Sequence, residues 1–209
     1  KMLTADLRGI CHTCPSGAIT YDPKGDTPPE PAPPVNSLKP RENGPYAVHA
    51  TIIMDGKPDG YRATLCRCGA SKNKPYCDGS HTTIGFRASG EPETRPSDPL
   101  KVRNGELRID PEVNGPLQVT GNLEICSGTG RNVDRVQSVR LCRCGGSKNK
   151  PFCDNSHIAA KFAATGEPET IAPELTKRYG DVIQRLSFYA PYSSDQSRWA
   201  QVIADIKSV

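Results

Sequence analysis

The sequence predicts a mainly β fold with short helices (α+β), built from two homologous halves that each contain a cysteine-rich loop. Two sixteen-residue segments repeat 76 residues apart, beginning at Cys66 and at Cys142. Alternating apolar residues precede each segment, which is typical of half-buried strands. Glycine and proline are frequent, with 19 and 20 residues, and they favour turns between short elements.

The composition excludes several classes of protein. Of the 209 residues, 35% are hydrophobic and 6% aromatic, which is little for a large core, so metals or other cross-links are expected. The net charge of +4 is too small to indicate nucleic-acid binding. No apolar run is long enough to span a membrane or to act as a signal peptide. We therefore expect a cytoplasmic protein, or one imported by a signal that this sequence lacks.

The cysteines indicate metal binding rather than a disulfide framework. The count is odd, and six of the nine fall into two compact groups, which suits a reducing compartment. The nine are Cys11, Cys14, Cys66, Cys68, Cys77, Cys126, Cys142, Cys144 and Cys153.

The repeat organises the chain. Residues 66–81 and 142–157 agree at thirteen of sixteen positions, and the likeness continues from FRASGEPET at 86–94 to FAATGEPET at 162–170. Upstream, Asn43-Gly44-Pro45 resembles Asn114-Gly115-Pro116 at an offset of 71 residues. We therefore expect repeats over residues 41–95 and 96–170.

Each repeat has a strand pattern before its cysteines. Apolar residues alternate over 46–54 and 117–125, and short strands are expected at 61–65 and 136–141. Asp55-Gly56 is a turn signal, and residues 100–109 are interpreted as a hairpin about Asn104-Gly105.

The flanking segments differ in composition. Residues 22–40 contain seven prolines and are expected to form an extended linker. Residues 171–209 lose the strand pattern. There Asp195 could cap a helix with Trp199, Val202, Ile203 and Ile206 on one face, which we expect to dock on the core.

Each repeated segment presents three cysteines and a histidine. The spacing is Cys-x-Cys, eight residues, Cys, three residues, His. Thiolates favour iron–sulfur clusters, zinc or Cu(I), and Cys-x-Cys is shorter than the first pair of usual zinc sites. The two close sulfurs could share one iron, while the later Cys and His could take a second. An iron–sulfur cluster is favoured, with structural zinc and disulfides as alternatives.

Residues between the candidate ligands have interpretable roles. Pro75 and Pro151 restrict the backbone before the third cysteine. Asp78 and Asp154 are suited to cap the turn that carries the histidine. Gly69 and Gly145 would allow backbone N–H groups to approach sulfur closely.

Both segments resemble the CDGSH iron–sulfur signature of the NEET family, C-x-C-x2-[ST]-x3-P-x-C-D-G-[STA]-H, and the resemblance covers residues 41–170. The first fits at every position, and the second has Asn155 in place of glycine, a mild departure because Asn tolerates left-handed backbone. The fitting residues are Cys66, Cys68, Ser71, Pro75, Cys77, Asp78, Gly79, Ser80 and His81, and Cys142, Cys144, Ser147, Pro151, Cys153, Asp154, Ser156 and His157.

The resemblance implies one [2Fe-2S] cluster per motif, hence two per chain. Its ligands would be Cys66, Cys68, Cys77 and His81 in one motif, and Cys142, Cys144, Cys153 and His157 in the other. Family members with one motif are homodimers with a swapped β-cap. A tandem chain could form that pseudo-twofold from its own halves, as a monomer without a membrane span.

Residues 7–21 resemble the last ligand region of a divergent mono-cluster ferredoxin domain. In that reading residues 1–21 are a remnant in which Cys14 has lost its partner ligands. A Cys11-x-x-Cys14 redox pair is the weaker alternative.

Two functions are compatible with these motifs. The first is one-electron transfer to a redox partner, and the alternative is storage, sensing or donation of clusters to an apo-acceptor protein. An enzyme is not expected, because only His12 and His49 lie outside the motifs and no catalytic set is evident.

Overall fold

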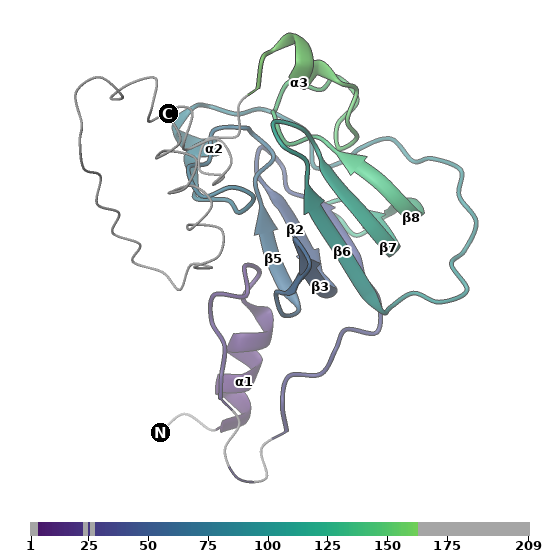
Figure 1. Cartoon of the computed structure of the whole chain (residues 1–209). Helices are drawn as coiled ribbons and strands as arrows, with labels where there is room; N and C mark the ends of the chain where they lie inside the picture. The colour runs from purple at the N-terminus through teal and green to yellow at the C-terminus, as the bar shows by residue number, and fades with distance from the viewer. Residues whose placement is uncertain (1–3, 23–24, 26–27, 163–209) are drawn as a thin grey trace, which may run out of the picture.

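The computed structural model describes residues 4–22, 25 and 28–162, with side chains from residue 7 onward. Its elements confirm a mainly β chain with short helices (Figure 1). The strands are β1 (Ser37–Pro40), β2 (Tyr46–His49), β3 (Thr51–Met54), β4 (Lys57–Pro58), β5 (Arg62–Leu65), β6 (Glu106–Pro111), β7 (Leu117–Cys126) and β8 (Asn132–Leu141). The helices are α1 (Thr4–Thr13), α2 (Ser80–Thr83) and α3 (Ser156–Ala159).

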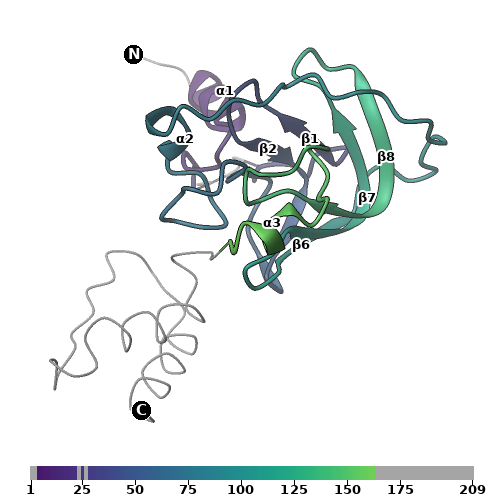
Figure 2. The ribbon, with the colours of Figure 1, turned by 90° about the horizontal axis from the view of Figure 1, so that it is seen from above.

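All eight strands belong to one curled sheet. Its order is β4-β3-β6-β7-β1-β2-β5, with β8 paired to β7. Because β8 follows β7 along its length, β6 and β1 share the other edge of β7. Figure 2 shows the sheet curving around its own interior, with α2 and α3 at different places along one rim.

The two repeats exchange strand pairings. In one exchange β1 pairs with β7 in parallel, through Ser37 with Glu124 and Leu38 with Ile125. In the other β6 pairs with β3 in parallel, and its register includes Arg108 with Ile53 and Ile109 with Met54. A shift of 71 residues turns each pair of the first exchange into a pair of the second. The predicted intramolecular pseudo-twofold is therefore present in the strand register.

The core lies inside the curled sheet, where both repeats contribute. The predicted alternation is visible in β3, in which Ile52 and Met54 are buried while Thr51 and Ile53 are partly exposed. Burying such faces together removes apolar surface from water, the main favourable term in folding. The core consists of Leu38, Tyr46, Val48, Ala50, Ile52, Met54, Ala63, Leu65, Leu107, Ile109, Leu117, Val119, Leu123, Ile125, Val133, Leu141 and Phe152.

The hairpin predicted about Asn104-Gly105 is wrong. A two-residue type I′ turn needs positive φ at both central residues. Asp55 and Gly56 meet this requirement with φ of 50° and 76° and join β3 to β4, whereas at the other pair only Gly105 does, with φ 97°. Residues 100–105 form no strand, and β6 pairs with β3 and β7 instead.

The expected linker of residues 22–40 also differs at its C-terminal end. Residues 37–40 are strand β1, because their N–H and C=O groups find partners in β2 and β7. The Asn36 side chain anchors this end, since its Nδ2 donates to the carbonyl oxygens of Gly105 at 3.0 Å and Asn122 at 2.9 Å.

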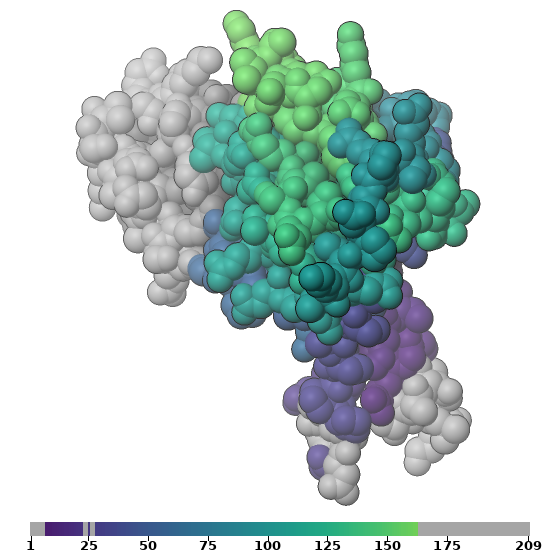
Figure 3. All heavy atoms as spheres, turned by 90° about the vertical axis from the view of Figure 1, so that its right-hand side faces the viewer, coloured from purple at the N-terminus to yellow at the C-terminus, as the bar shows by residue number. Residues whose placement is uncertain are grey.

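The N-terminal segment contacts the edge strand β5. Thr64 Oγ1 donates to the carbonyl oxygen of Pro15 at 3.1 Å, and Arg62 forms an ion pair with Glu30. In the space-filling view this segment projects from the end of the molecule opposite α3 (Figure 3). The helix predicted near Asp195 lies outside the described residues. Within the described ranges, no helix is both long and apolar enough to cross a membrane.

Candidate metal centres

Each cysteine loop begins where an edge strand ends and returns to that strand. Cys66 N donates to the carbonyl oxygen of Pro75 at 2.8 Å, and Cys77 N donates to that of Thr64 at 2.9 Å. The second loop repeats both bonds, from Cys142 to Pro151 and from Cys153 to Arg140, at 2.8 and 2.9 Å. Both loops are thus closed by backbone bonds at one end of the sheet (Figure 1).

The predicted donors meet in pairs. In the first loop the sulfurs of Cys66 and Cys68 are 3.8 Å apart, and Cys77 Sγ is 3.3 Å from His81 Nδ1. In the second loop Cys142 and Cys144 are also 3.8 Å apart, and Cys153 Sγ is 3.5 Å from His157 Nδ1. No group of three or more His, Cys, Asp or Glu residues in the described part of the chain converges on a single ion.

The two pairs of each loop differ in exposure. Cys66 and Cys142 are each 1% exposed, whereas Cys77 and Cys153 are half-buried, as are His81 and His157. Cys68 is also buried, but Cys144 is half-buried like the outer donors. The first site therefore has a buried inner pair and an outer pair near solvent, whereas in the second site only Cys142 of the inner pair is buried.

Hydrogen bonding within each inner pair favours one thiolate. The bond from Cys68 lowers the pKa of Cys66 to about 6, and the same bond raises the pKa of Cys68. In the second loop Cys144 has its pKa lowered to about 6 by Cys142. Because such protons belong to the pair, one thiol of each inner pair ionises easily and the other retains its proton until a metal displaces it.

Backbone N–H groups point at four of the sulfurs. Ala70 N lies 3.4 Å from Cys68 Sγ, and Gly79 N lies 3.4 Å from Cys77 Sγ. Gly146 and Asn155 make the same contacts with Cys144 and Cys153, also at 3.4 Å. Such bonds stabilise anionic sulfur and help to set the reduction potential of a bound iron centre.

The prediction that Asp78 and Asp154 are the N-cap residues of the turns that carry the histidines is wrong by one position. The N-cap residue of α2 is Gly79, and that of α3 is Asn155, with φ of 86° and 66°. Asp78 instead joins two parts of its loop, since it accepts from Lys72 N at 2.8 Å and Ser80 N at 3.0 Å. The Ser80 hydroxyl and these N–H groups hold the pKa of Asp78 far below its usual range. Asp154 is bonded in the same way.

The two motif serines fasten their loops internally. Ser71 Oγ donates to the carbonyl oxygen of Tyr76 at 2.6 Å, and Ser147 Oγ donates to that of Phe152 at 2.7 Å. Pro75 and Pro151 follow cis peptide bonds and supply the carbonyl oxygens that close the loops.

The residue inside each Cys-x-Cys is a buried arginine, whose structural role was not predicted from the sequence. Arg67 and Arg143 are 1% and 0% exposed. Arg67 donates to the carbonyl oxygens of Arg41 and Ala88, both at 2.8 Å, and so ties its loop to the turn before β2. The signal available in the sequence was that a charged residue is identical in both copies.

A contact between the two loops was also missed. A methyl group placed on Gly69 would lie 2.5 Å from the carbonyl oxygen of Cys144, and one on Gly145 would lie 2.5 Å from that of Cys68. Both glycines have positive φ, 86° and 80°. They are required by the close approach of one loop to the other, in addition to the local freedom that the sequence suggested.

The lysines of the loops do not all face solvent. Lys72 and Lys148 are exposed, as expected for solvated loop lysines, but Lys74 is 6% exposed and its ammonium donates to the carbonyl oxygen of Ser71. Cys126 ends β7 as a buried thiol, and burial raises its pKa.

The sequence was compared with known protein families and proteins. It matches the family of iron-binding zinc finger domains of the CDGSH type twice, over residues 43–82 and 114–158. No curated protein matches the chain. The two matched segments contain both cysteine loops and the strands that carry them. The chain therefore contains two iron-binding domains of the CDGSH type in tandem, one around each cysteine loop.

Proposed function

We propose that the chain binds two [2Fe-2S] clusters, one in each cysteine loop, through three cysteines and one histidine per site. The first site would use Cys66, Cys68, Cys77 and His81, and the second Cys142, Cys144, Cys153 and His157. The observation that carries this proposal is the pairing of donors, at 3.8 and 3.3 Å in the first loop. Two separate pairs suit two metal ions, whereas structural zinc needs four donors around one ion.

A bound [2Fe-2S] cluster supplies one-electron chemistry. Around it, the chain provides an inner cysteine pair with at least one member buried against the core, Cys66 or Cys142, and N–H groups directed at the sulfurs. The outer Cys–His pair is half-buried, so an electron could pass to a partner at that side. We propose one-electron transfer to a redox partner as the function of the protein.

Purification under anaerobic conditions with assays of iron and acid-labile sulfide tests the cofactor. We expect about four iron atoms and about four sulfides per chain, with a visible spectrum of sulfide-to-iron charge transfer. A colourless protein that contains zinc and no sulfide, after expression with ample iron, would contradict the proposal.

Cluster donation is a second candidate function. The exposure of Cys77 and His81 favours it, because an acceptor thiol can reach the outer metal without unfolding of the core. Incubation with an apo-ferredoxin separates the two functions. Stoichiometric transfer to the acceptor supports donation, and retention of the clusters through repeated reduction and oxidation supports electron transfer.

We further propose a monomeric protein without catalytic activity of its own, in a reducing compartment such as the cytoplasm. The exchange of strands between the repeats supports the monomer, because it pairs within one chain the edges that a second copy would otherwise cover. The histidines outside the motifs have local contacts. His12 Nε2 lies 3.4 Å from Tyr21 Oη, and burial lowers the pKa of His49 within β2.

A further inference from the structure

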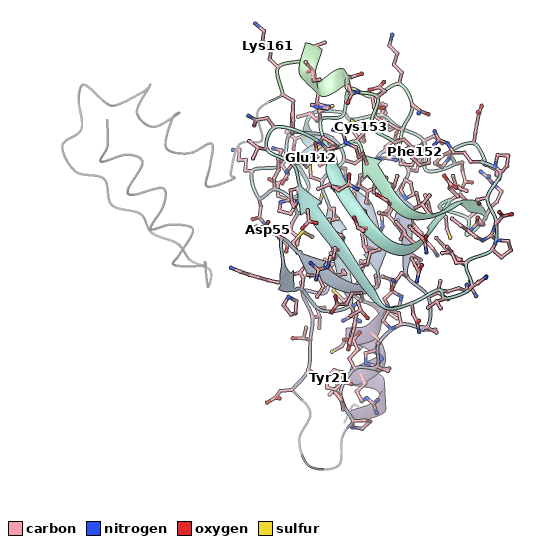
Figure 4. All side chains as sticks on the ribbon, turned by 45° about the vertical axis from the view of Figure 1, so that its right-hand side comes forward. Tyr21, Asp55, Glu112, Phe152, Cys153 and Lys161 are labelled. Atoms are coloured by element: carbon pink, nitrogen blue, oxygen red, sulfur yellow. The ribbon has the colours of Figure 1, made fainter. Side chains whose placement is uncertain are left out.

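The two loops have the same donors but differ in one network of side chains. At the second loop, Arg140 Nε and Nη2 donate to the carboxylate of Glu112 at 3.1 and 2.9 Å. Its third group, Nη1, donates to Asn155 Oδ1 at 3.4 Å. Glu112, Arg140 and Asn155, which we call the outer network, thus form a connected set beside the outer donor pair. Figure 4 shows Glu112 and Cys153 at the same end of the sheet, below α3.

The first loop lacks this network. Its counterparts of Glu112, Arg140 and Asn155 are Arg41, Thr64 and Gly79, which can form neither the ion pair nor the amide contact. Thr64 Oγ1 donates to the carbonyl oxygen of Pro15. Asn155 is the single departure of the second motif from the family signature. Two further differences between the repeats accompany it, because Arg140 contacts Asn155 and Glu112 pairs with Arg140.

The outer network acts on Cys153 through Asn155. Asn155 N donates to Cys153 Sγ at 3.4 Å, while its Oδ1 lies 4.0 Å from the same sulfur. A carbonyl-type oxygen near an anionic sulfur is repulsive, and the guanidinium of Arg140 offsets this repulsion by binding that oxygen. Arg140 also fixes Asn155 in the left-handed conformation, φ 66°, that glycine adopts more easily.

A second, independent difference between the two loops also favours stronger retention of the cluster at the second site. Tyr46 Oη, which is fully buried, donates to the carbonyl oxygens of Cys142 at 2.8 Å and Pro151 at 3.0 Å. The counterpart of Tyr46 in the other repeat is Leu117, which has no hydroxyl to offer the first loop. Both the inner and the outer parts of the second loop are therefore held by contacts that the first loop lacks.

We propose that the second site retains its cluster more strongly than the first, and that Arg140 is the positioning residue that holds its outer donor pair. The inference rests on the proposed function and assigns different roles to the two sites. The first is the exchangeable site and the second is the retained one.

Partial release followed by alkylation measures each site separately. The iron-loaded chain is treated with an iron chelator, samples are alkylated at intervals, and peptide mass spectrometry follows Cys77 for the first site and Cys153 for the second. We expect Cys77 to become alkylated roughly two- to fivefold faster, the range that an exposed charge-assisted contact supports.

The variant Arg140→Thr places the first-site residue in the second repeat. It should raise the alkylation rate of Cys153 toward that of Cys77 and leave Cys77 unchanged, so the first site is an internal control. It should also lower the reduction potential of the second site alone, because a positive charge near a ligand sulfur favours the reduced state. Arg140→Lys, which retains the charge but not the fork, should lie between parent and Arg140→Thr.

Arg108→Thr is the matched control. It makes the same residue change and the same loss of charge at an exposed ion pair, with Glu106 at 3.7 Å in β6. It should leave both alkylation rates at their parent values. Equal alkylation rates of Cys77 and Cys153 in the parent would overturn the inference. An Arg140→Thr variant in which the alkylation rate of Cys153 does not change would also overturn it. Absence of iron and sulfide from the purified chain instead overturns the proposed function together with it.

Discussion

Arg67, between the first two cysteines, carries a buried guanidinium whose two terminal nitrogens, Nη1 and Nη2, donate to backbone carbonyl oxygens. Besides its bonds to Arg41 and Ala88, it donates to the carbonyl oxygen of Ser89 at 3.1 Å. Its guanidinium carbon also lies 5.5 Å from the centre of the Phe86 ring. The charge is thus surrounded by carbonyl oxygens and an aromatic face, which compensate for its removal from water.

Replacement of Arg67 by methionine should destabilise the iron-loaded protein by about 2–4 kcal/mol, because three partly buried carbonyl oxygens lose their donor. Lysine should not rescue the loss, since one ammonium cannot reproduce the planar fork. Anaerobic urea unfolding measures the change, with Arg108→Met as an exposed control expected within about 0.5 kcal/mol of the parent. A stability of Arg67→Met equal to that control would refute this role.

Cys14, which lies outside the two motifs, is a further thiol that should ionise near neutral pH. Its sulfur lies 3.5 Å from Ser16 Oγ, and the bond from this hydroxyl, followed by the N–H group of Ile19, lowers its pKa to about 7. The thiolate is therefore the main form above about pH 7, and it is the form that alkylating reagents attack.

The alkylation rate of Cys14 should rise as the pH increases through about 7 and level off above it. Cys126, whose pKa is raised by burial, should react slowly over the same interval. Ser16→Ala should move the Cys14 profile to higher pH because the hydroxyl donor is lost. Mass spectrometry of peptides alkylated at a series of pH values gives both profiles. A Cys14 rate that is still increasing at about pH 9 is incompatible with the lowered pKa.

At the scale of elements, the two cysteine loops form one interlocked unit. Gly69 of one loop lies against Cys144 of the other, and Gly145 lies against Cys68. Because the contacts are between backbones, neither loop can move without displacing its neighbour. A change at this backbone contact should therefore affect both sites, whereas a change at an exposed side chain away from it, such as Arg140, should affect only its own site.

Gly69→Ala should reduce the iron content of both sites, since the new methyl group would lie 2.5 Å from the Cys144 carbonyl oxygen. Overpacking and the unfavourable φ together should lower the free energy of unfolding by about 2–5 kcal/mol. Gly56→Ala is the control for φ alone, with φ 76° and open space around the position. Iron assays and alkylation of Cys77 and Cys153 report each site. Loss of iron from the first site alone would contradict the interlocking.

The sequence predicted those elements that depend on local pattern. The strands at 46–54 and 117–125 follow from period-two alternation, and the pairing of Cys77 with His81 follows from their spacing. The prediction of a hairpin at Asn104-Gly105 was wrong because β6 pairs with β3 and β7 instead of with the residues just before the turn. The role of Tyr46 could not be predicted for the same reason, since its hydroxyl bonds to residues of the other repeat.

At the scale of the whole molecule, each repeat completes the sheet of the other. β1 covers part of an edge of β7, and β6 covers an edge of β3. Without the second repeat, β1 and β3 would each present an unpaired edge, which proteins avoid because such edges join to other chains. A second copy of the first repeat could cover these edges, because the strand registers of the two exchanges are equivalent.

An isolated fragment of residues 28–95 should therefore form a symmetric dimer and not a folded monomer. In that dimer Ser37 of one copy would take the position opposite Ile53 of the other, as Ser37 faces Glu124 and Ile53 faces Arg108 in the intact chain. Light scattering after size-exclusion chromatography gives the mass of the iron-loaded fragment, with the full chain at the same concentration as the monomeric reference. A fragment that binds iron as a folded monomer would mean that one repeat satisfies its own edges, and the exchange of strands would then not be what holds the two halves together.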